Sequence, residues 1–164
     1  MSVKWGLNLR RVVTGHDANG KAIVKIDEIA THLREGRPGA KSCNIWTTDT
    51  SPADSSSDGD AGKRDGVFTM LHGGTVFRVI EFGPGVARRM HRTDSVDYLV
   101  VMSGEIDMEL DDGVVVHIKQ GDVMVQRGTI HNWVNKGTEP CVVAVVLVHA
   151  NPAVAGGKVL EAVG

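Results

Sequence analysis

Short runs of apolar residues, separated by turn residues, dominate the chain from Gly74 onward. Residues 105–110 alternate strictly, with apolar side chains on one face of a predicted strand and acidic side chains on the other. The Asp112-Gly113 pair that follows favours a hairpin turn into residues 114–118. Further strands are predicted over residues 75–82, 88–93, 96–102, 123–126, 131–134 and 141–149. Because such a meander must protect its edges, we expect an all-β fold, a small antiparallel β-barrel.

The first half of the chain has a less regular pattern. Residues 12–14 and 22–26 flank a glycine-containing turn and are predicted to pair as a hairpin. Residues 26–33 are expected to form one or two helical turns, and residues 44–48 a short strand. Elements of this kind extend the barrel at its N-terminal side.

Residues 50–66 hold serine, aspartate and glycine and few side chains that could be buried, so they are predicted to form a long loop. Two alternatives stay open for this loop, a mobile surface segment or a lid over a pocket. A chain of 164 residues suits one structural domain. We expect residues 1–73 to pack on the barrel, residues 74–150 to form its core and residues 151–164 to form a tail.

Composition and charge exclude several classes of function. Eighteen basic and 20 acidic side chains give a net charge of -2, and no stretch dense in Lys and Arg favours a nucleic-acid partner. No window approaches the ~20 apolar residues of a membrane span, and residues 1–11 lack the pattern of a signal peptide. Cys43 and Cys141 are too few for a disulfide scaffold. We therefore expect a cytoplasmic protein without nucleic-acid or membrane partners.

Two groups of glycine, histidine and acidic residues flank the acidic hairpin. The first has the spacing G(X)5-H-X-T-(X)3-D-(X)6-G and consists of Gly85, His91, Thr93, Asp97 and Gly104. The second has the spacing G(X)6-G-(X)2-H-(X)3-N and consists of Gly121, Gly128, His131 and Asn135. Such spacing places histidines on two strands that a barrel can bring together.

These groups resemble the two motifs of the cupin superfamily, G(X)5-H-X-H-(X)3,4-E-(X)6-G and G(X)5-P-X-G-(X)2-H-(X)3-N. The spacing of the first motif matches throughout, but Thr93 stands at the second His position and Asp97 at the Glu position. In the second motif Gln126 replaces Pro, and the segment before it is one residue shorter. The resemblance covers residues 85–135 and implies a small single-domain cupin with a jelly-roll, or double-stranded β-helix, fold.

The residues of the motifs suggest a metal site and an alternative to it. On extended chain His91, Thr93 and Asp97 share one face, and His131 lies on a later strand. Two imidazoles and one carboxylate form a ligand set for a divalent ion such as Fe, Mn, Ni or Zn. The resemblance implies three His and one Glu, so a metal-free site also stays open. In that site Asp97 orients one histidine while His91 or His131 moves protons. No organic cofactor is expected.

Five further side chains are candidates for binding a small molecule, namely Arg78, Thr93, Tyr98, Gln126 and Trp133. Arg78 shares a face with apolar residues that should point inward, where its guanidinium would bind a carboxylate. The alternative for Arg78 is a position at the end of the barrel, paired with Glu81. Gln126 and Tyr98 offer hydrogen bonds, and Trp133 offers a flat wall or core packing.

Three functions follow from these candidates. The first is a small-molecule enzyme that acts on a carboxylate or hydroxylated metabolite by proton transfer, as an isomerase, dehydratase or decarboxylase. Iron held by the triad would make it a dioxygenase instead. The second is a metabolite-binding or sensing barrel without catalysis, and the third is a structural protein with a vestigial pocket.

Burying His91, Asp97 and His131 costs stability unless function retains them, which favours the enzyme. The resemblance also implies a homodimer, in which the apolar hairpin around residues 22–26 packs on the partner's barrel.

Overall fold

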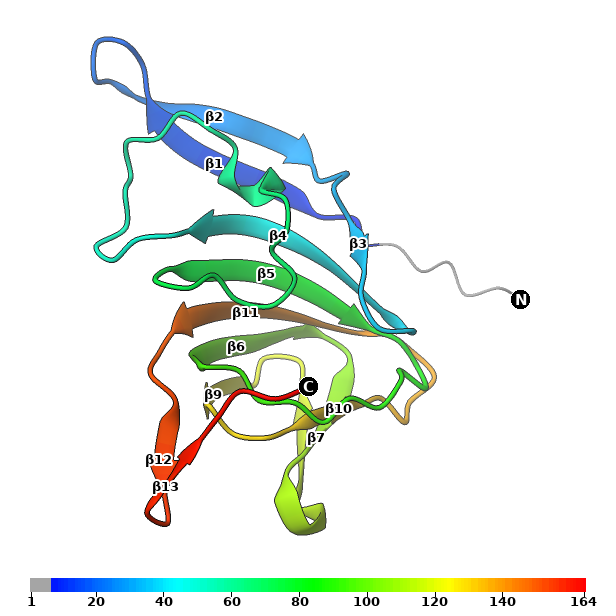
Figure 1. The fold of residues 1–164 in the computed structure, drawn as a ribbon. Helices are drawn as coiled ribbons and strands as arrows, with labels where there is room; N and C mark the ends of the chain where they lie inside the picture. Colours follow the sequence, from blue (N-terminus) through cyan, green and yellow to red (C-terminus); the bar gives the residue numbers. More distant parts are fainter. Residues whose placement is uncertain (1–6) are drawn as a thin grey trace.

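A computed structural model describes residues 7–164, which form two β-sheets packed on each other and two separate hairpins (Figure 1). The larger sheet has six antiparallel strands in the order β3-β4-β5-β11-β6-β9. These strands are β3 (Arg34–Glu35), β4 (Ala40–Thr48), β5 (Thr75–Phe82), β11 (Cys141–His149), β6 (Ser95–Ser103) and β9 (Val123–Arg127). The smaller sheet has the order β10-β7-β8, with β10 (Asn132–Val134), β7 (Glu105–Glu109) and β8 (Val115–Lys119). The all-β jelly-roll prediction is confirmed.

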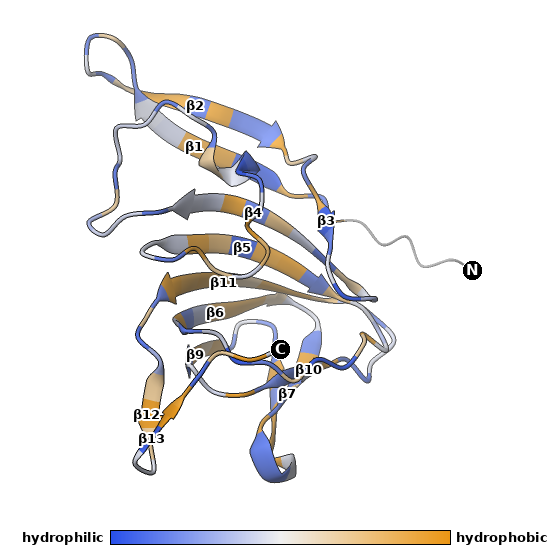
Figure 2. Ribbon diagram, viewed as in Figure 1, coloured by the Kyte–Doolittle hydropathy of each residue, from blue (hydrophilic) through white to orange (hydrophobic). Residues whose placement is uncertain are grey.

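The core lies between the two sheets. Strand β11 supplies much of it, because alternate side chains from Cys141 to Leu147 are buried on one face. The smaller sheet contributes Ile106, Met108 and Trp133, which belong to the same buried cluster. Figure 2 shows the apolar stretches of β5 and β11 running through the middle of the larger sheet. Alternation of this kind leaves one face of each strand directed at the space between the sheets.

Several predicted elements are confirmed. Strands β5 and β11 have the predicted bounds, and β7 joins β8 through a short 3-10 turn, η2 (Asp111–Gly113). Asp112 and Gly113 both have positive φ there, at 55° and 73°, as an Asp-Gly turn favours. The N-terminal hairpin consists of β1 (Arg10–His16) and β2 (Ala22–Ile29) and lies beyond β4 at the edge of the fold (Figure 1).

Three expectations for local structure are corrected. The predicted helical turns over residues 26–33 are wrong, because β2 continues to Ile29 and pairs with β1. The predicted strand over residues 88–93 is reduced to isolated bridges, His91 with His131 and Arg92 with Val163. The C-terminal tail contains a hairpin, β12 (Ala153–Ala155) and β13 (Lys158–Leu160). In each of these segments, hydrogen bonding to a neighbouring stretch of extended chain determined the local structure.

The long loop over residues 50–66 is present, and its end carries a 3-10 turn, η1 (Ala61–Lys63). Asp60 caps η1 by accepting a hydrogen bond from the Gly62 main-chain nitrogen. In the N-terminal hairpin, Ile23 and Val24 are exposed and offer an apolar surface. The homodimer that would cover this surface stays a prediction. No helix within residues 7–164 is long and apolar enough to cross a membrane.

Candidate active site

A cavity of about 150 Å³ lies between the sheets, and the inner faces of strands from the larger sheet form most of its wall. Apolar side chains from β5, β6, β10 and β11 line one part of it. The ionisable and polar side chains around the rest include Arg37, Arg78, Arg89, His91, Thr93, Asp97, Gln126 and His131. Seven of the eight site residues predicted from the sequence therefore line one cavity, Tyr98 being the exception.

His91 and His131 form a closely held pair. Their main chains exchange two hydrogen bonds, of 3.0 and 2.9 Å, and their ring centroids lie 4.1 Å apart. Nδ1 of His91 lies 3.1 Å from the carbonyl oxygen of Arg89, and Nδ1 of His131 lies 3.0 Å from that of Thr129. Because a carbonyl oxygen only accepts, Nδ1 of His91 carries the hydrogen of its neutral ring, and Nε2 of His91 is the unprotonated, basic position. Nδ1 of His131 also contacts the side-chain amide of Gln126, and an amide nitrogen donates, so the bond to Thr129 requires the Gln126 amide to turn its oxygen toward the ring.

The surroundings keep both imidazoles neutral. Burial lowers the pKa of His91, and the nearby guanidinium groups of Arg89 and Arg37 lower it further. Burial, together with the proximity of His91, lowers the pKa of His131 to about 4. The side-chain amide of Gln126 contacts Nδ1 of His131 and helps fix the ring. A pair of neutral, oriented imidazoles can accept protons or bind a cation.

Asp97 takes part in a hydroxyl chain that the sequence reasoning missed. Oγ of Ser95 donates a hydrogen bond of 2.6 Å to Oδ1 of Asp97, and Oγ1 of Thr93 lies 2.8 Å from the same Oγ. Burial raises the pKa of the Asp97 carboxyl, while the bond from Ser95 opposes this rise. The shared parity of Thr93, Ser95 and Asp97 along extended chain was the signal that could have identified Ser95.

The three predicted metal ligands do not gather into a metal site. Within the described part of the chain, residues 7–164, no three His, Cys, Asp or Glu side chains lie close enough together to hold a metal ion. His91 and His131 are adjacent, but the Asp97 carboxyl is bonded to Ser95 and its burial favours the neutral form. The predicted set of two His and one Asp is therefore not assembled as a ligand cluster in this arrangement, and metal binding by it stays a prediction.

Arg78 lies inside the molecule, as one of its two alternatives predicted, but most of its donors are used. Nε donates to Oδ1 of Asn44, while Nη1 and Nη2 donate to the carbonyl oxygens of Phe68 and Val67. Burial lowers the pKa of Arg78 to about 10. Arg78 thus holds the segment at residues 67–68 against the cavity wall. The alternative, a pairing with Glu81 or another acid, is not found, because no ion pair within residues 7–164 includes Arg78.

Trp133 and Tyr98, the two aromatic residues predicted to contact a small molecule, lie in different places. Trp133 stacks on Phe82 with ring centroids 5.8 Å apart and meets the His131 ring edge-on at 5.7 Å, so it forms both core and cavity wall. Tyr98 points away from the cavity, because it follows Asp97 on β6, and it is 53% exposed on the outer face of the sheet. The structure therefore does not bring the Tyr98 hydroxyl to this site.

Arg37 and Arg89 also line the cavity, although no motif singled them out. Buried Asn132 connects them, since its Oδ1 accepts from Nη1 of Arg37 at 3.2 Å and from the main-chain nitrogen of Arg89 at 2.8 Å. Arg89 could have been identified by parity, because it lies two residues before His91. Arg37 carries no such signal, because its contact with Asn132 spans 95 positions.

Two β-sheets with a cavity and a histidine pair between them form a jelly-roll class of fold, and the mouth of a β-barrel is a common place for small-molecule sites in proteins. A family model described as a cupin domain matches residues 78–148 of the chain. The chain belongs to the cupin family, as relatives over most of its length also show.

Two curated relatives illustrate this membership, and one solved structure illustrates the fold. The chain is 36% identical over 157 residues to the cupin-domain-containing oxidoreductase fogC of Aspergillus ruber, covering 92% of this chain and 77% of that protein. It is 37% identical over 164 residues to phomopsin biosynthesis cluster protein D of Diaporthe leptostromiformis, covering 93% and 85%. The cupin domain of Schizosaccharomyces pombe Cnp3 superposes with a TM-score of 0.54 at 12% identity, covering 85% of this chain and 87% of that one. This last likeness concerns the fold alone.

Proposed function

We propose that the protein is a small-molecule enzyme that moves protons on a carboxylate or hydroxylated organic metabolite. The observation that carries this proposal is the pair of adjacent, buried imidazoles on the wall of one cavity, with each Nδ1 beside a main-chain carbonyl oxygen. Fixed imidazoles within reach of a substrate are the commonest groups for general acid and base catalysis. The names of the relatives, which refer to oxidoreductases and to a biosynthesis cluster, support a role in metabolite chemistry.

The reaction would begin when Nε2 of His131 or His91 takes a proton from a carbon next to a carbonyl, or from a hydroxyl group. The electron pair left behind moves onto the substrate oxygen, where the positive charge of Arg37 and Arg89 stabilises it. The imidazolium then returns the proton to another atom of the same molecule. Isomerisation therefore balances without a co-reactant. In dehydration the imidazolium gives the proton to the leaving hydroxyl, which departs as water. In decarboxylation the imidazole takes the proton of the carboxyl group, CO2 leaves, and the proton returns to the carbon that held it.

Asp97 has a supporting role in this proposal. Its carboxyl lies opposite Gln126 on the paired strand β9, and Gln126 contacts His131. The hydrogen bond from Ser95 fixes one oxygen of Asp97, whose side chain lines the cavity. Asp97 is therefore a cross-strand neighbour of the contact between Gln126 and His131.

The relatives named as oxidoreductases support a second candidate, an oxidation at the same cavity. That reaction requires an oxidant, which in a dioxygenase is molecular oxygen, and an iron ion bound through His91 and His131 would activate it. Elemental analysis of protein purified without an affinity tag or chelator, beside an Asp97→Ala control, tests this candidate. Near-stoichiometric iron together with oxygen consumption would favour it over metal-free proton transfer.

Exchange of carbon-bound hydrogen in D2O tests the proposed proton transfer without knowledge of the product. A panel of β-keto acids and hydroxylated aromatic carboxylates is incubated with the protein and followed by proton NMR. We expect at least one member to exchange faster than in buffer, and His131→Ala to lower that rate by about 100-fold or more. The matched control is Arg88→Gln, because the Arg88 side chain is 66% exposed beside the site.

The opposite result is equally clear. If the whole panel exchanges at the buffer rate, or if His131→Ala retains the wild-type rate, proton transfer by this pair is rejected. Binding of panel members without exchange would then identify a metabolite-binding barrel, the second of the three functions predicted from the sequence.

A further inference from the structure

The cavity wall carries positive charge that its own acidic side chains do not balance. Arg37, Arg78 and Arg89 line it, whereas Asp97 is the one carboxyl among the described lining residues. None of the ion pairs formed within residues 7–164 joins these arginines to a side-chain carboxylate. Arg37 and Arg89 are half-buried, and positive charges gathered on one wall of a cavity without a side-chain carboxylate between them attract an anion to it.

Neutral groups hold Arg37 and the Arg89 segment at one place. Asn132, which is 1% exposed, accepts hydrogen bonds from Nη1 of Arg37 and from the main-chain nitrogen of Arg89. Nδ2 of Asn132 in turn donates to Glu109 at 3.1 Å, which fixes the orientation of its amide. The guanidinium of Arg37 also lies over the Phe82 ring, 5.6 Å from its centroid.

Most N–H groups of the two guanidinium groups remain free for a ligand. Arg37 uses one donor, toward Asn132, and Arg89 uses one, from Nη2 to the main-chain oxygen of Gly164 at 2.7 Å. Arg78 differs from both, because protein oxygens accept from its Nε, Nη1 and Nη2. The carboxylate-binding role expected for Arg78 therefore fits Arg37 and Arg89 better.

The remainder of the cavity suits a flat apolar group. Trp133 and Phe82 stack with an interplanar angle of 28°, and Leu99, Val143 and Val145 complete the apolar wall. The volume of about 150 Å³ is that of a cavity able to hold a benzene-sized ring. A ring against the stacked aromatics would present its substituent toward the arginines and the histidine pair.

We propose that Arg37 and Arg89 bind the carboxylate of the substrate, so that the substrate class is small aromatic or similarly planar carboxylates. This inference rests on the proposed function, since it names the substrate class of the same cavity. Asn132 is a positioning residue in this arrangement, because it reaches the substrate only through the two arginines. Two guanidinium groups on one carboxylate give charge-assisted hydrogen bonds that a neutral analogue cannot make.

Calorimetric titration with benzoate and with benzamide, its neutral analogue of the same shape, tests the proposal. We expect the purified protein to bind benzoate at least 10-fold more tightly than benzamide. Arg37→Gln and Arg89→Gln should each weaken benzoate binding by 10-fold or more, with little change for benzamide. Arg88→Gln, on the neighbouring exposed side chain, should stay within twofold of wild type. Arg37→Lys, which keeps the charge without the planar fork, should give an intermediate loss.

Equal affinity for benzoate and benzamide, no benzoate binding at millimolar concentration, or full affinity in Arg37→Gln with a native thermal transition would each overturn the inference. His131→Ala separates it from the proposed function. If this variant loses hydrogen exchange and keeps its benzoate affinity, both proposals stand. If benzoate binds in an Arg37-dependent way but no panel member exchanges, the proton-transfer function fails and the carboxylate site remains.

Discussion

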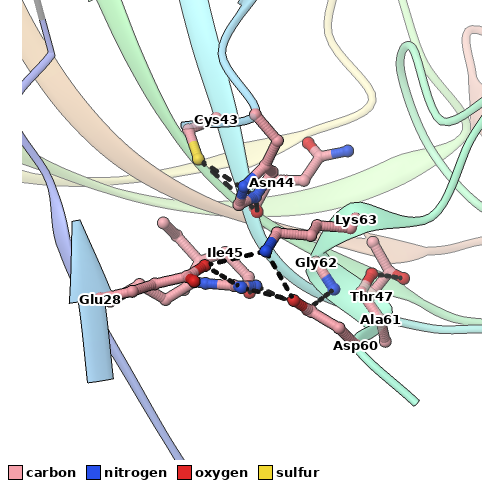
Figure 3. A network of polar contacts seen from close by, with 11 residues as sticks. Glu28, Cys43, Asn44, Ile45, Thr47, Asp60, Ala61, Gly62 and Lys63 are labelled. Atoms are coloured by element: carbon pink, nitrogen blue, oxygen red, sulfur yellow. Dashed lines mark hydrogen bonds and ion pairs between the residues drawn. The ribbon is translucent and has the colours of Figure 1, made fainter. Parts of the chain in front are cut away.

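The molecule holds arginines in two opposite electrostatic settings. Arg11, on β1, is fully buried and donates to both oxygens of Asp60, at 2.7 and 2.6 Å, and to Glu28 at 2.7 Å. Figure 3 shows Glu28, Asp60 and Lys63 meeting at this network beside Gly62. Arg37 and Arg89 border the cavity and have asparagine or main-chain partners instead of side-chain carboxylates. The first setting balances its charge internally, and the second leaves charge available to a ligand.

The pKa values follow the same division. The hydrogen bond to Asp60 raises the pKa of Arg11, and the same bond lowers the pKa of Asp60 to about 2. Burial, followed by the charge of Arg89, lowers the pKa of Arg37. The fold stabilises the charged form of Arg11, which ties the loop that carries Asp60 to the N-terminal hairpin. The fold disfavours the charged form of Arg37, which indicates a binding site.

The largest expected effect is a loss of stability in mild acid that comes from the cavity. The pKa of His131 is about 4 when folded and about 6.5 in the unfolded chain. Between these values the unfolded chain binds a proton that the folded protein refuses, so the free energy of unfolding decreases as the pH falls from 6.5 to 4. The decrease should reach about 3 kcal/mol, and His91 adds to it in the same direction.

Urea denaturation of chelator-treated protein at pH 7.5 and pH 5 measures about 2 kcal/mol of this decrease, because pH 5 lies above the folded pKa. His131→Gln should lose a large part of the difference between the two pH values. The Asp60 contribution lies lower, since its stability is present above pH 3.8 and is lost as the pH falls toward 2. An identical pH dependence in wild type and His131→Gln would show that this ring is not held neutral.

The next largest effect concerns the balanced network. Asp60→Asn removes the carboxylate with two bonds to Arg11, and should lower the free energy of unfolding by about 2 kcal/mol. This figure is below that of a fully buried pair because the Asp60 side chain is 25% exposed and Glu28 remains. The control is Asp27→Asn, which breaks the exposed pair with Arg10 and should change much less. Equal losses in the two variants would contradict the comparison.

Gly62 tests how closely the loop must approach this network. A Cβ at Gly62 would overlap Nη1 of Arg11 and lie 2.6 Å from the carbonyl oxygen of Ile45. Gly62→Ala should therefore destabilise the protein by about 1 to 2 kcal/mol, because the neighbouring main chain cannot give way freely. Gly59→Ala is the matched control, since nothing lies within 4 Å of its added Cβ. Thermal or urea unfolding of both variants decides whether the loop is anchored here.

The smallest expected effect on the free energy of unfolding is that of Arg37→Gln, and it is an increase where the variants above give a decrease. Arg37→Gln removes a partly buried charge that burial and Arg89 disfavour, so stability should be unchanged or rise by about 0.5 kcal/mol. The same variant loses benzoate affinity, which separates stability from binding. A loss of stability as large as that of Asp60→Asn would mean that Arg37 belongs to the structural class of arginines.

Strands with continuous patterns could be predicted from sequence. Strands β5 and β11 have their predicted bounds because runs of β-branched residues leave little competition for strand pairing. Ile26 and Ile29 are three apart, a spacing that also suits a helix, and pairing with β1 decided in favour of a strand. The hairpin of β12 and β13 was missed, although Gly156-Gly157 is a turn signal.

Some features of the candidate site follow from the local sequence, and others depend on residues that are far apart in the chain. Parity along a strand places His91, Thr93 and Asp97 on the inner face, and the same parity should have excluded Tyr98. The sequence could not show that Asp97 bonds to Ser95 in place of completing a metal site with the histidines. It also could not show Arg37 beside Asn132, since only the fold brings these residues together.

The most direct test of the two arginine settings is an NMR spectrum of the arginine Nε–H groups, recorded while benzoate is added to ¹⁵N-labelled protein. The account predicts that the signals of Arg37 and Arg89 shift progressively and saturate, while the signal of Arg11 stays in place. Signals assigned with single Arg→Gln variants make the comparison unambiguous. Unchanged Arg37 and Arg89 signals at saturating benzoate, or a shift confined to Arg11, would contradict the assignment of the cavity as the carboxylate site.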